Sequence, residues 1–502
     1  MIDWNKMIKM LLLERIKIME EVKNKRLAKK SEDISKWYLE LIEQAKLADY
    51  GPAKGTMIIR PYGYAIWENV VSAMDKMIKD SGAVNGYFPL FIPNSLFSKE
   101  KDHVAGFAPE TAVVTYGGGE KLKDPLVVRP TSEMIMYESY AKWISSWRDL
   151  PMIINQWNNV VRWEKRTYPF LRTTEFLWQE GHGAHATHEE SWERTIWGVE
   201  MYKKIYQDYF ALDGLIGRKS ESERFAGAID TLPYEILVEG GKVLQSCTSH
   251  DLGQNFSKAL GISFQDKDGK SEFVWQNSWG FSTRSIGALI LGHGDDKGLV
   301  LPPKLAPVRI TILPILGKDD KMVLDYCQKI KDFLDSEKSE FPGKVEVSLD
   351  DTKSYGFRVN ESELLGIPIK ITVGLKEIED ETVSVGFRLS GMEKITCKLE
   401  DVSKNTEKWL EEIQKKMFTN SQEFLQKNTY SAKDMDEFAS IMKTTKGLIK
   451  AYWCEGKTCE SNIKEATTAS TRLKLLDAKK EDKTCVYCGK KAEYEWYFGQ
   501  AY

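Results

Sequence analysis

The sequence predicts a mixed α/β protein built from several modules, and three observations support this fold class. The chain has 502 residues, which is more than a single hydrophobic core usually organises. Beyond residue 308, strand-like and helix-like segments alternate, which is typical of a small α/β domain. Two close cysteine pairs lie within the last fifty residues and indicate a further small module. We therefore divide the chain into residues 1–30, 31–300, 301–417 and 418–502.

Residues 1–30 are Lys-rich and amphipathic, and we expect an N-terminal extension that is either a solvated helix or a flexible segment. Glu14, Glu20 and Glu21 argue against a transit peptide, which is poor in acidic residues. No run of eighteen apolar residues occurs, so no membrane span is expected. Seven cysteines without a disulfide framework indicate a reducing compartment, and we expect a cytoplasmic protein. The net charge of −3 neither demands nor excludes a nucleic-acid partner.

In the region 31–300, strand-like segments at 160–165 and 173–178 flank a basic stretch that contains a proline, which predicts a hairpin. Arg162 on the first strand can make bidentate contacts to a carboxylate or phosphate, and Arg172 on the loop can reach the far end of a polyphosphate. Taken alone, this pattern fits a surface salt-bridge network at least as well. Arg284 precedes the apolar stretch 286–290, which predicts an arginine at the start of a helix and packed on an aromatic ring.

Residues 301–307 are rich in proline and predict a linker. Four strands are predicted after it, at 308–313, 345–349, 369–373 and 382–387, together with a helix at 322–337. Their alternation predicts a small α/β domain with a mostly parallel sheet. A long charged helical region is predicted to begin near residue 408, ahead of the C-terminal module.

The C-terminal cysteines are Cys454, Cys459, Cys485 and Cys488. Two such pairs predict a tetrahedral Zn²⁺ site, because each short loop can place two sulfur atoms about 2.3 Å from one ion. A site of this kind is a structural clip and performs no chemistry. The alternative is a set of reduced thiols whose spacing is accidental.

His182, His185 and His188 are spaced as in some metal sites, but we expect them to be structural. Thr187-x2-Glu190 predicts the N-terminus of a helix at Thr187, which would leave the three histidines without a common helical face. His182 remains a candidate for lining the active site. The basic segments 217–219 and 224–227 predict either a contact with an RNA backbone or a solvated face.

Several of these segments together resemble a known family. Arg162-x-Glu164, Arg172-x3-Phe176-x3-Glu180 and Arg284 resemble motifs 2 and 3 of class II aminoacyl-tRNA synthetases. The segments 129–133, 175–182 and 247–256 are similar to those of prolyl-tRNA synthetases, and the weakest match, motif 1, falls at 86–93. The resemblance runs from about Ser31 to Tyr502. It is closest to the archaeal/eukaryotic type, whose C-terminal zinc-binding domain and terminal Tyr this chain shares.

The resemblance implies a fold and an activity. The fold is an α+β catalytic domain with an antiparallel sheet and helices, an α/β anticodon-binding domain and a small α/β zinc-binding domain. The activity is ATP-dependent attachment of L-proline to tRNA(Pro) through prolyl-adenylate, by a homodimer that uses Mg²⁺ and carries structural Zn²⁺. Arg358 and Arg388 are candidate contacts to the tRNA anticodon.

The resemblance also assigns residues to proline and to ATP. The proline set is Thr131, Glu133, Arg162, Trp178 and His250. The ATP set is Arg162, Glu164, Arg172, Thr173, Phe176, Gln245, Thr248, Ser282 and Arg284. Within the proline set, Thr131 and Glu133 would receive the secondary ammonium, while Trp178 and His250 would wall the ring.

Within the ATP set, Arg162 would bridge the proline carboxylate and the α-phosphate, and Arg172 would hold the γ-phosphate. Phe176 and Arg284 would sandwich the adenine. Gln245 and Thr248 would reach the nucleotide, Gln245 through Mg²⁺, which keeps water ligands and leans on substrate phosphates.

Two other classes of function remain open. A non-catalytic paralogue that binds tRNA as a sensor or scaffold would be favoured by loss of Glu133, Arg162, Arg172 or Arg284, and all four are present. A zinc-ribbon nucleic-acid binder with an unrelated first domain leaves the proline-pocket segments unexplained. Only about a hundred residues separate Glu180 from Arg284, which leaves no room for an editing insertion. We therefore expect misactivation of alanine or cysteine, because missing methylenes discriminate weakly.

Overall fold

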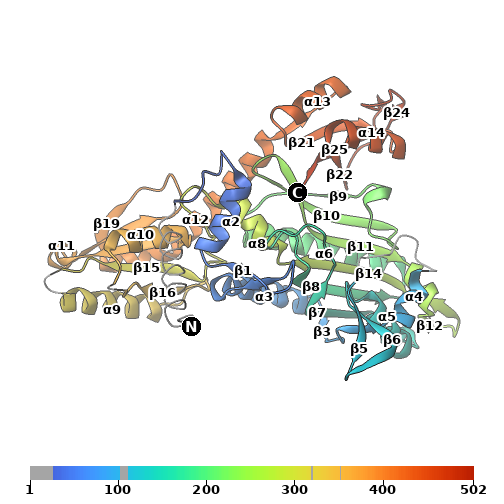
Figure 1. The fold of residues 1–502 in the computed structure, drawn as a ribbon, viewed down its shortest axis with the longest axis horizontal. Coiled ribbons are helices and arrows are strands. Elements are labelled where there is room, and N and C mark those ends of the chain that lie inside the picture. The colour runs from blue at the N-terminus through green and yellow to red at the C-terminus, as the bar shows by residue number, and fades with distance from the viewer. Residues whose placement is uncertain (1–25, 102–110, 318–319, 351) are drawn as a thin grey trace, which may run out of the picture.

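The computed structural model describes residues 26–101, 111–317, 320–350 and 352–502, so most of the predicted N-terminal extension lies outside the described residues. A sheet of eleven strands forms the centre, and a separate five-stranded sheet lies at one end of the elongated molecule (Figure 1). The strands of the large sheet, in spatial order, are β20 (Thr429–Ser431), β21 (Leu448–Trp453), β25 (Tyr494–Ala501), β22 (Ser470–Leu475), β9 (Leu215–Arg218), β10 (Asp230–Val238), β11 (Lys242–Gly253), β14 (Trp275–Ser282), β8 (Glu175–His185), β7 (Met152–Val161) and β3 (Val84–Asn85).

The run from β9 to β7 pairs antiparallel throughout, as the resemblance predicted. Helices of this region are α2 (Ile34–Gln44), α3 (Pro61–Asp80), α4 (Asn94–Lys101), α5 (Glu133–Trp143), α6 (His188–Asp208), α7 (Asn255–Leu260) and α8 (Arg284–His293). The smaller sheets are β1 (Ala48–Tyr50) with β2 (Met57–Ile59), β4 (Phe91–Pro93) with β6 (Glu120–Val128) and β5 (Val113–Gly117), and β12 (Ser263–Gln265) with β13 (Ser271–Phe273).

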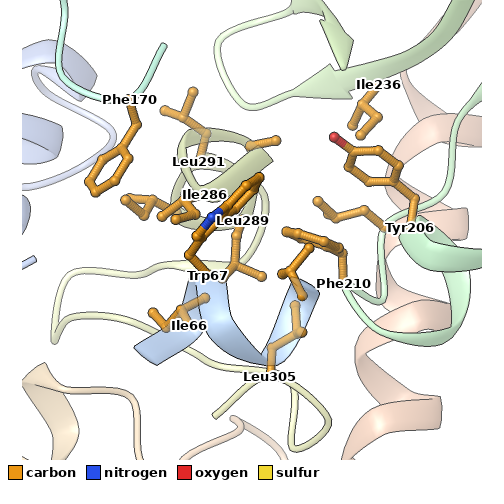
Figure 2. Packing of buried hydrophobic residues seen from close by; sticks show 14 of the residues in the cluster. Ile66, Trp67, Phe170, Tyr206, Phe210, Ile236, Ile286, Leu289, Leu291 and Leu305 are labelled. Atoms are coloured by element: carbon orange, nitrogen blue, oxygen red, sulfur yellow. The ribbon is translucent and has the colours of Figure 1, made fainter. Parts of the chain in front are cut away.

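Helices α3, α6 and α8 bury one continuous core beside the large sheet. Trp67 on α3, Tyr206 on α6 and Leu289 on α8 belong to this core and are buried (Figure 2). Helix α6 begins at the predicted place, because the Thr187 side chain accepts a hydrogen bond from the backbone N–H of Glu190. His182 and His185 lie on β8 and His188 on α6, so the three histidines share no helical face, as predicted.

The predicted hairpin around Arg162 exists with longer strands and a longer loop. Strand β7 ends at Val161 and β8 begins at Glu175, so Arg162 lies just beyond a strand end and not within the strand, as had been expected. Arg162 is still held by the sheet, because its backbone N–H donates to the carbonyl of Thr174 across the hairpin.

The five-stranded sheet has the order β16 (Lys344–Val347), β15 (Val308–Pro314), β17 (Ile369–Val373), β18 (Thr382–Phe387) and β19 (Ile395–Lys398). Its helices are α9 (Asp320–Ser336), α10 (Tyr355–Leu364) and α11 (Leu375–Glu379). The prediction of a mostly parallel sheet is wrong, because β15 pairs parallel with β16 and β17, whereas β18 pairs antiparallel with β17 and β19. A parallel return needs a crossover of about a dozen residues, and only the short α11 connects β17 to β18.

Helix α12 (Leu399–Lys427) begins earlier than predicted and runs through the predicted boundary at 417/418. It leads into the C-terminal module, whose helices are α13 (Met435–Lys443) and α14 (Lys457–Thr467) and whose short hairpin is β23 (Lys483–Thr484) with β24 (Lys491–Ala492). Strand β22 of this module pairs with β9, and the end of β25 pairs with β11. The C-terminal module therefore extends the sheet of the first region, which no sequence pattern indicated.

Candidate active site

A cavity of about 450 Å³ opens on one face of the large sheet. It collects ten of the side chains that the sequence assigned to substrates: Thr131, Glu133, Arg162, Phe176, Trp178, Gln245, Thr248, His250, Ser282 and Arg284. Strands β8, β11 and β14 supply most of the lining, because alternate residues of a strand face the same side of a sheet.

A β-bulge explains how Gln245 and Thr248 share that face despite an odd spacing. Along the β10–β11 pair, Glu235 lies opposite Gln245 while Tyr234 lies opposite Cys247, so one residue of β11 is extra at Ser246. A bulge of this kind reverses the alternation beyond it and re-aims side chains, often next to a functional site.

One end of the cavity is acidic and buried. Glu133 is 3 % exposed and accepts a hydrogen bond from the Thr131 hydroxyl. Burial raises the pKa of Glu133, and the neighbouring Glu180 carboxylate raises it further, although His182 opposes the shift. Glu133 is therefore a carboxylate that a cation from solution would stabilise.

Glu180 lies beside Glu133 but has its own partners. Its carboxylate accepts hydrogen bonds from the backbone N–H of Ser132 at 3.1 Å and from Asn158 Nδ2 at 2.7 Å, and His182 Nε2 lies 3.2 Å away. Burial alone would raise the pKa of Glu180, but His182 and hydrogen bonds from the side chains of Ser132 and Asn158 hold it below its usual value. Ligand atoms of Glu133, Glu180 and His182 all lie within 4.8 Å of one another, so the cluster favours a positively charged guest.

The wall of this acidic end is aromatic and carries little charge. Trp178 projects from β8, and Gly280 on β14 makes room for it, because a Cβ at Gly280 would lie 3.2 Å from the indole ring. Both ring nitrogens of His250 are hydrogen-bonded to hydroxyls. Thr231 Oγ1 lies 3.0 Å from Nδ1, and Thr248 Oγ1 lies 2.9 Å from Nε2. Burial, followed by His182 and Arg162, lowers the pKa of His250 to about 3, so its ring is neutral and does not repel a cation.

The other end of the cavity is cationic. The Arg162 guanidinium lies over the rings of Phe176 and Trp178, at 5.4 and 5.5 Å, and its Nε donates to the carbonyl of Pro130. Arg284 begins α8, as predicted, and donates from Nε to Leu171 O and from Nη1 to Gln245 O. Burial, followed by Arg162 and Arg172, lowers the pKa of Arg284 to about 10, which marks a strongly positive site that an anion would relieve.

The remaining three predicted residues lie outside the cavity lining. Arg172 Nε lies 3.9 Å from the Glu164 carboxylate on the hairpin loop, where both side chains stay partly exposed. Thr173 is buried, and its hydroxyl donates to the carbonyl of Glu175. The Thr173 hydroxyl thus supports the loop, and the contact of Thr173 with ATP stays a prediction.

Sequence reasoning missed one wall of the cavity. Residues 223–226 line it, and the Phe225 ring lies 4.6 Å from the His250 ring. Of these residues, 224–226 were expected to meet RNA or solvent, because nothing local in a basic, glycine-containing segment shows which side faces a cavity.

The two arginines predicted to read the anticodon are buried. Arg358 donates to the carbonyls of Ser348 and Pro314, both at 2.7 Å. Arg388 forms a bidentate ion pair with Asp295, and its Nε donates to the carbonyl of Glu363. Both side chains hold the protein together, which contradicts the prediction that they contact bases.

The four C-terminal cysteines come together. All four sulfur atoms lie within 4.8 Å of one another, and Cys454 Sγ lies 3.6 Å from Cys459 Sγ and 3.8 Å from Cys488 Sγ. Tetrahedral ligands at about 2.3 Å from Zn²⁺ would be about 3.8 Å apart. The backbone N–H of Lys490 lowers the pKa of Cys488 to about 7, whereas burial raises the pKa of Cys454 and of Cys459, so a bound cation would be needed to hold the cluster as thiolates. The donor set and its spacing fit zinc.

Tyr502 lies against the hairpin loop of the candidate active site. Its backbone N–H donates to the carbonyl of Val243, and its ring lies 6.4 Å from that of Tyr168. Tyr168 in turn stacks on Tyr38 at 5.1 Å. The last residue of the chain therefore lies beside the loop that carries Arg172.

Among the described residues, no helix is both long enough and apolar enough to cross a membrane.

Comparison with known proteins gives concordant matches along the chain. The family model described as tRNA synthetase class II core domain (G, H, P, S and T) matches residues 116–293, the anticodon binding domain matches 309–409, and the prolyl-tRNA synthetase C-terminal model matches 435–502. The chain is 47% identical over 488 residues to a proline--tRNA ligase of Borreliella burgdorferi (strain ZS7), covering 95% of this chain and 99% of the relative. It is 46% identical over 483 residues to the proline--tRNA ligase of Natranaerobius thermophilus, which covers 95% of this chain and 98% of that relative.

A solved structure is similar over nearly the same length. The crystal structure of prolyl-tRNA synthetase from Cryptosporidium parvum, complexed with halofuginone and AMPPNP, superimposes with a TM-score of 0.89 and 37% identity. The match covers 95% of this chain and 99% of that chain.

Proposed function

The chain belongs to the prolyl-tRNA synthetase family and attaches L-proline to tRNA(Pro) with ATP, and from that premise we propose how its residues divide the work. The observation that carries the proposal is the polarity of the cavity, with the buried Glu133 at one end and Arg162 and Arg284 at the other. A zwitterionic amino acid joined to a polyphosphate has the complementary distribution of charge.

Proline binds at the acidic end. Glu133 and Thr131 receive its secondary ammonium, and the neutral His250 and Trp178 enclose the ring. Arg162 binds the carboxylate and turns it toward the nucleotide. The same guanidinium reaches the α-phosphate, so the reacting groups are held together by one side chain.

ATP occupies the cationic end. Phe176 and Arg284 hold the adenine between them, and Arg172, partnered by Glu164, swings from the loop to the γ-phosphate. Gln245, Thr248 and Ser282 contact the nucleotide. Gln245 would hold Mg²⁺, which would supply neutralisation of the phosphate charge.

The chemistry follows from this placement. A carboxylate oxygen of proline attacks the α-phosphorus, pyrophosphate leaves, and prolyl-adenylate forms. A terminal ribose hydroxyl of the tRNA then attacks the prolyl carbonyl and releases AMP. Positioning and neutralisation of developing charge carry both steps, so no protein nucleophile is needed.

We expect proline binding to weaken as the pH falls toward mildly acidic values. Burial raises the pKa of Glu133, so this carboxyl takes up a proton at a higher pH than an exposed glutamate and then no longer attracts the ammonium. Glu133→Gln should raise the KM for proline by about a hundredfold, in line with the cost of leaving a buried charge unpaired, and should flatten its pH dependence. ATP–pyrophosphate exchange over a pH series measures both effects.

Glu138→Gln, on the exposed side of the same helix, is the control and should behave as wild type. Glu180, His182 and Arg162 also face Glu133, so a pH response that persists in the Glu133→Gln variant would assign the titration to one of them and contradict this prediction.

Structural zinc is proposed at the four C-terminal cysteines, where it would hold two loops together and take no part in the reaction.

The division into residues 31–300, 301–417 and 418–502 remains a proposal, supported by the three family models, each of which falls within one of these ranges. None of the seven cysteines, all of which are described, takes part in a disulfide, which supports the proposed cytoplasmic location.

A homodimer is proposed through the sheet edge at β3. Val84 and Tyr87 are 61% and 74% exposed beside this edge, and an unpaired apolar edge invites association with closed two-fold symmetry. Sedimentation at micromolar concentration should give the dimer mass, and Tyr87→Glu should give the monomer. Tyr116→Glu, which alters an exposed ring on β5, is the control, and a monomeric wild type would refute the proposal.

A further inference from the structure

The cavity wall that sequence reasoning missed belongs to residues 219–229, which we call the wall segment. It connects β9 to β10 and contains a short 3-10 helix at Glu221–Glu223. On its inner side, Phe225 packs on His250, and the backbone N–H of Phe225 donates to the same Thr231 hydroxyl that contacts His250. The wall segment thus forms part of the proposed proline site.

The outer side of the wall segment is held by Glu460 of the C-terminal module. Glu460 is 8% exposed, and its carboxylate accepts hydrogen bonds from Ser220 Oγ at 2.8 Å and Ser222 Oγ at 2.5 Å. Thr471 on β22 donates to the same carboxylate. Hydrogen bonds to an ionised acceptor are stronger than neutral ones, so this buried carboxylate is a firm anchor.

The position of Glu460 in the chain is set by the cysteine cluster. Glu460 follows Cys459 directly, in the first turn of α14, and Cys454 precedes that helix. Two ion pairs run alongside the anchor, from Lys457 to Glu221 and from Lys464 to Glu223. Both pairs are largely exposed and add little, because surface ion pairs are weak.

We propose that Glu460 is a positioning residue for proline: its carboxylate fixes the wall segment so that Phe225 keeps its place on His250. The C-terminal module, which lies outside the cavity, thereby sets the affinity for the amino acid. This inference rests on the proposed role of His250 as a wall of the proline site.

The effect should be selective for proline over ATP. The adenine partners Phe176 and Arg284 come from β8 and α8, and Arg284 is anchored on Leu171 and Gln245, away from the wall segment. A displaced Phe225 therefore loosens the amino-acid end and leaves the nucleotide end in place.

Glu460→Ala is expected to raise the KM for proline in ATP–pyrophosphate exchange, and the proline Kd measured by calorimetry, by about tenfold, while the KM for ATP stays within about twofold. Glu460→Gln keeps an acceptor oxygen and should recover part of the loss. The control is Glu465→Ala, an exposed position on the same helix. The melting temperature and bound zinc show whether each variant is folded.

A double-mutant cycle tests the route through the wall segment. Ser222→Ala should weaken proline binding in the same way, and the double variant with Glu460→Ala should be no worse than Glu460→Ala alone. Unchanged proline affinity in Glu460→Ala, or equal changes for proline and ATP, would overturn the proposal.

Phe225→Ala separates this inference from the pocket assignment. A normal proline affinity in Phe225→Ala would show that the wall segment is not part of the proline site, and would overturn this inference with it. Weakened binding in Phe225→Ala with normal binding in Glu460→Ala and Ser222→Ala would overturn only the role of Glu460.

Discussion

Replacing Arg162 by alanine is expected to lower kcat/KM for proline-dependent ATP–pyrophosphate exchange by about a thousandfold or more, the scale at which removal of a preorganised charge at a reacting centre acts. Arg162 is proposed to hold both the proline carboxylate and the α-phosphate, so its loss removes positioning and charge neutralisation together. Its guanidinium already lies over Phe176 and Trp178 when no substrate is present.

Arg162→Lys should restore little activity, because an ammonium cannot make two parallel hydrogen bonds from one planar group. Arg166→Ala, on the same hairpin loop and exposed, is the matched control and should exchange at the wild-type rate when tRNA is absent. Near-normal exchange by Arg162→Ala would show that another residue performs the bridging.

Removal of one zinc ligand is expected to have the largest effect on stability. Cys485 is buried in the cysteine cluster, and Cys485→Ser should lose the bound metal and several kcal/mol of folding free energy. Because β22 and β25 belong to the same sheet as β9, β10 and β11, the loss should lower the temperature at which the catalytic region unfolds as well.

Metal content by mass spectrometry, thermal unfolding by circular dichroism and proline exchange together measure this effect. Cys397→Ser, a half-buried thiol on β19 outside the cluster, is the control and should keep both metal and melting temperature. A zinc-free Cys485→Ser protein that melts like wild type would refute a stabilising metal, and purification of the wild type without zinc would refute the metal site.

The sequence predicted those parts of the structure that depend on local pattern. Helix α8 begins at Arg284, α6 begins after Thr187, and the hairpin between Arg162 and Arg172 exists, because caps, turns and apolar periodicity act over a few residues. The cysteine cluster could also be predicted, since each pair is close in sequence and a metal accounts for all four. Ten of the proposed substrate contacts meet in one cavity, and this could be predicted because their segments resemble those of a known family.

The features that sequence reasoning missed depend on contacts between distant residues. The sequence made Arg388 a candidate contact to RNA, but Asp295, which belongs to the region 31–300, forms an ion pair with it. The bulge at Ser246 depends on how β11 pairs with β10, which no single strand encodes. The packing of Phe225 on His250 brings a loop against a strand, which depends on the tertiary fold. The pairing of β22 with β9 could not be predicted, because backbone hydrogen bonds between strands do not depend on which sequence lies alongside.

That pairing has a consequence for protein synthesis. Strand β10, which pairs with one edge of β9, is translated directly after it. Strand β22, which pairs with the other edge, is translated only after the whole intervening α/β domain. Until then one edge of β9 has unpaired backbone groups, the kind of surface that recruits other nascent strands. A ribosome that stalls within the C-terminal module would therefore release an aggregation-prone chain, and not a shortened enzyme with reduced activity.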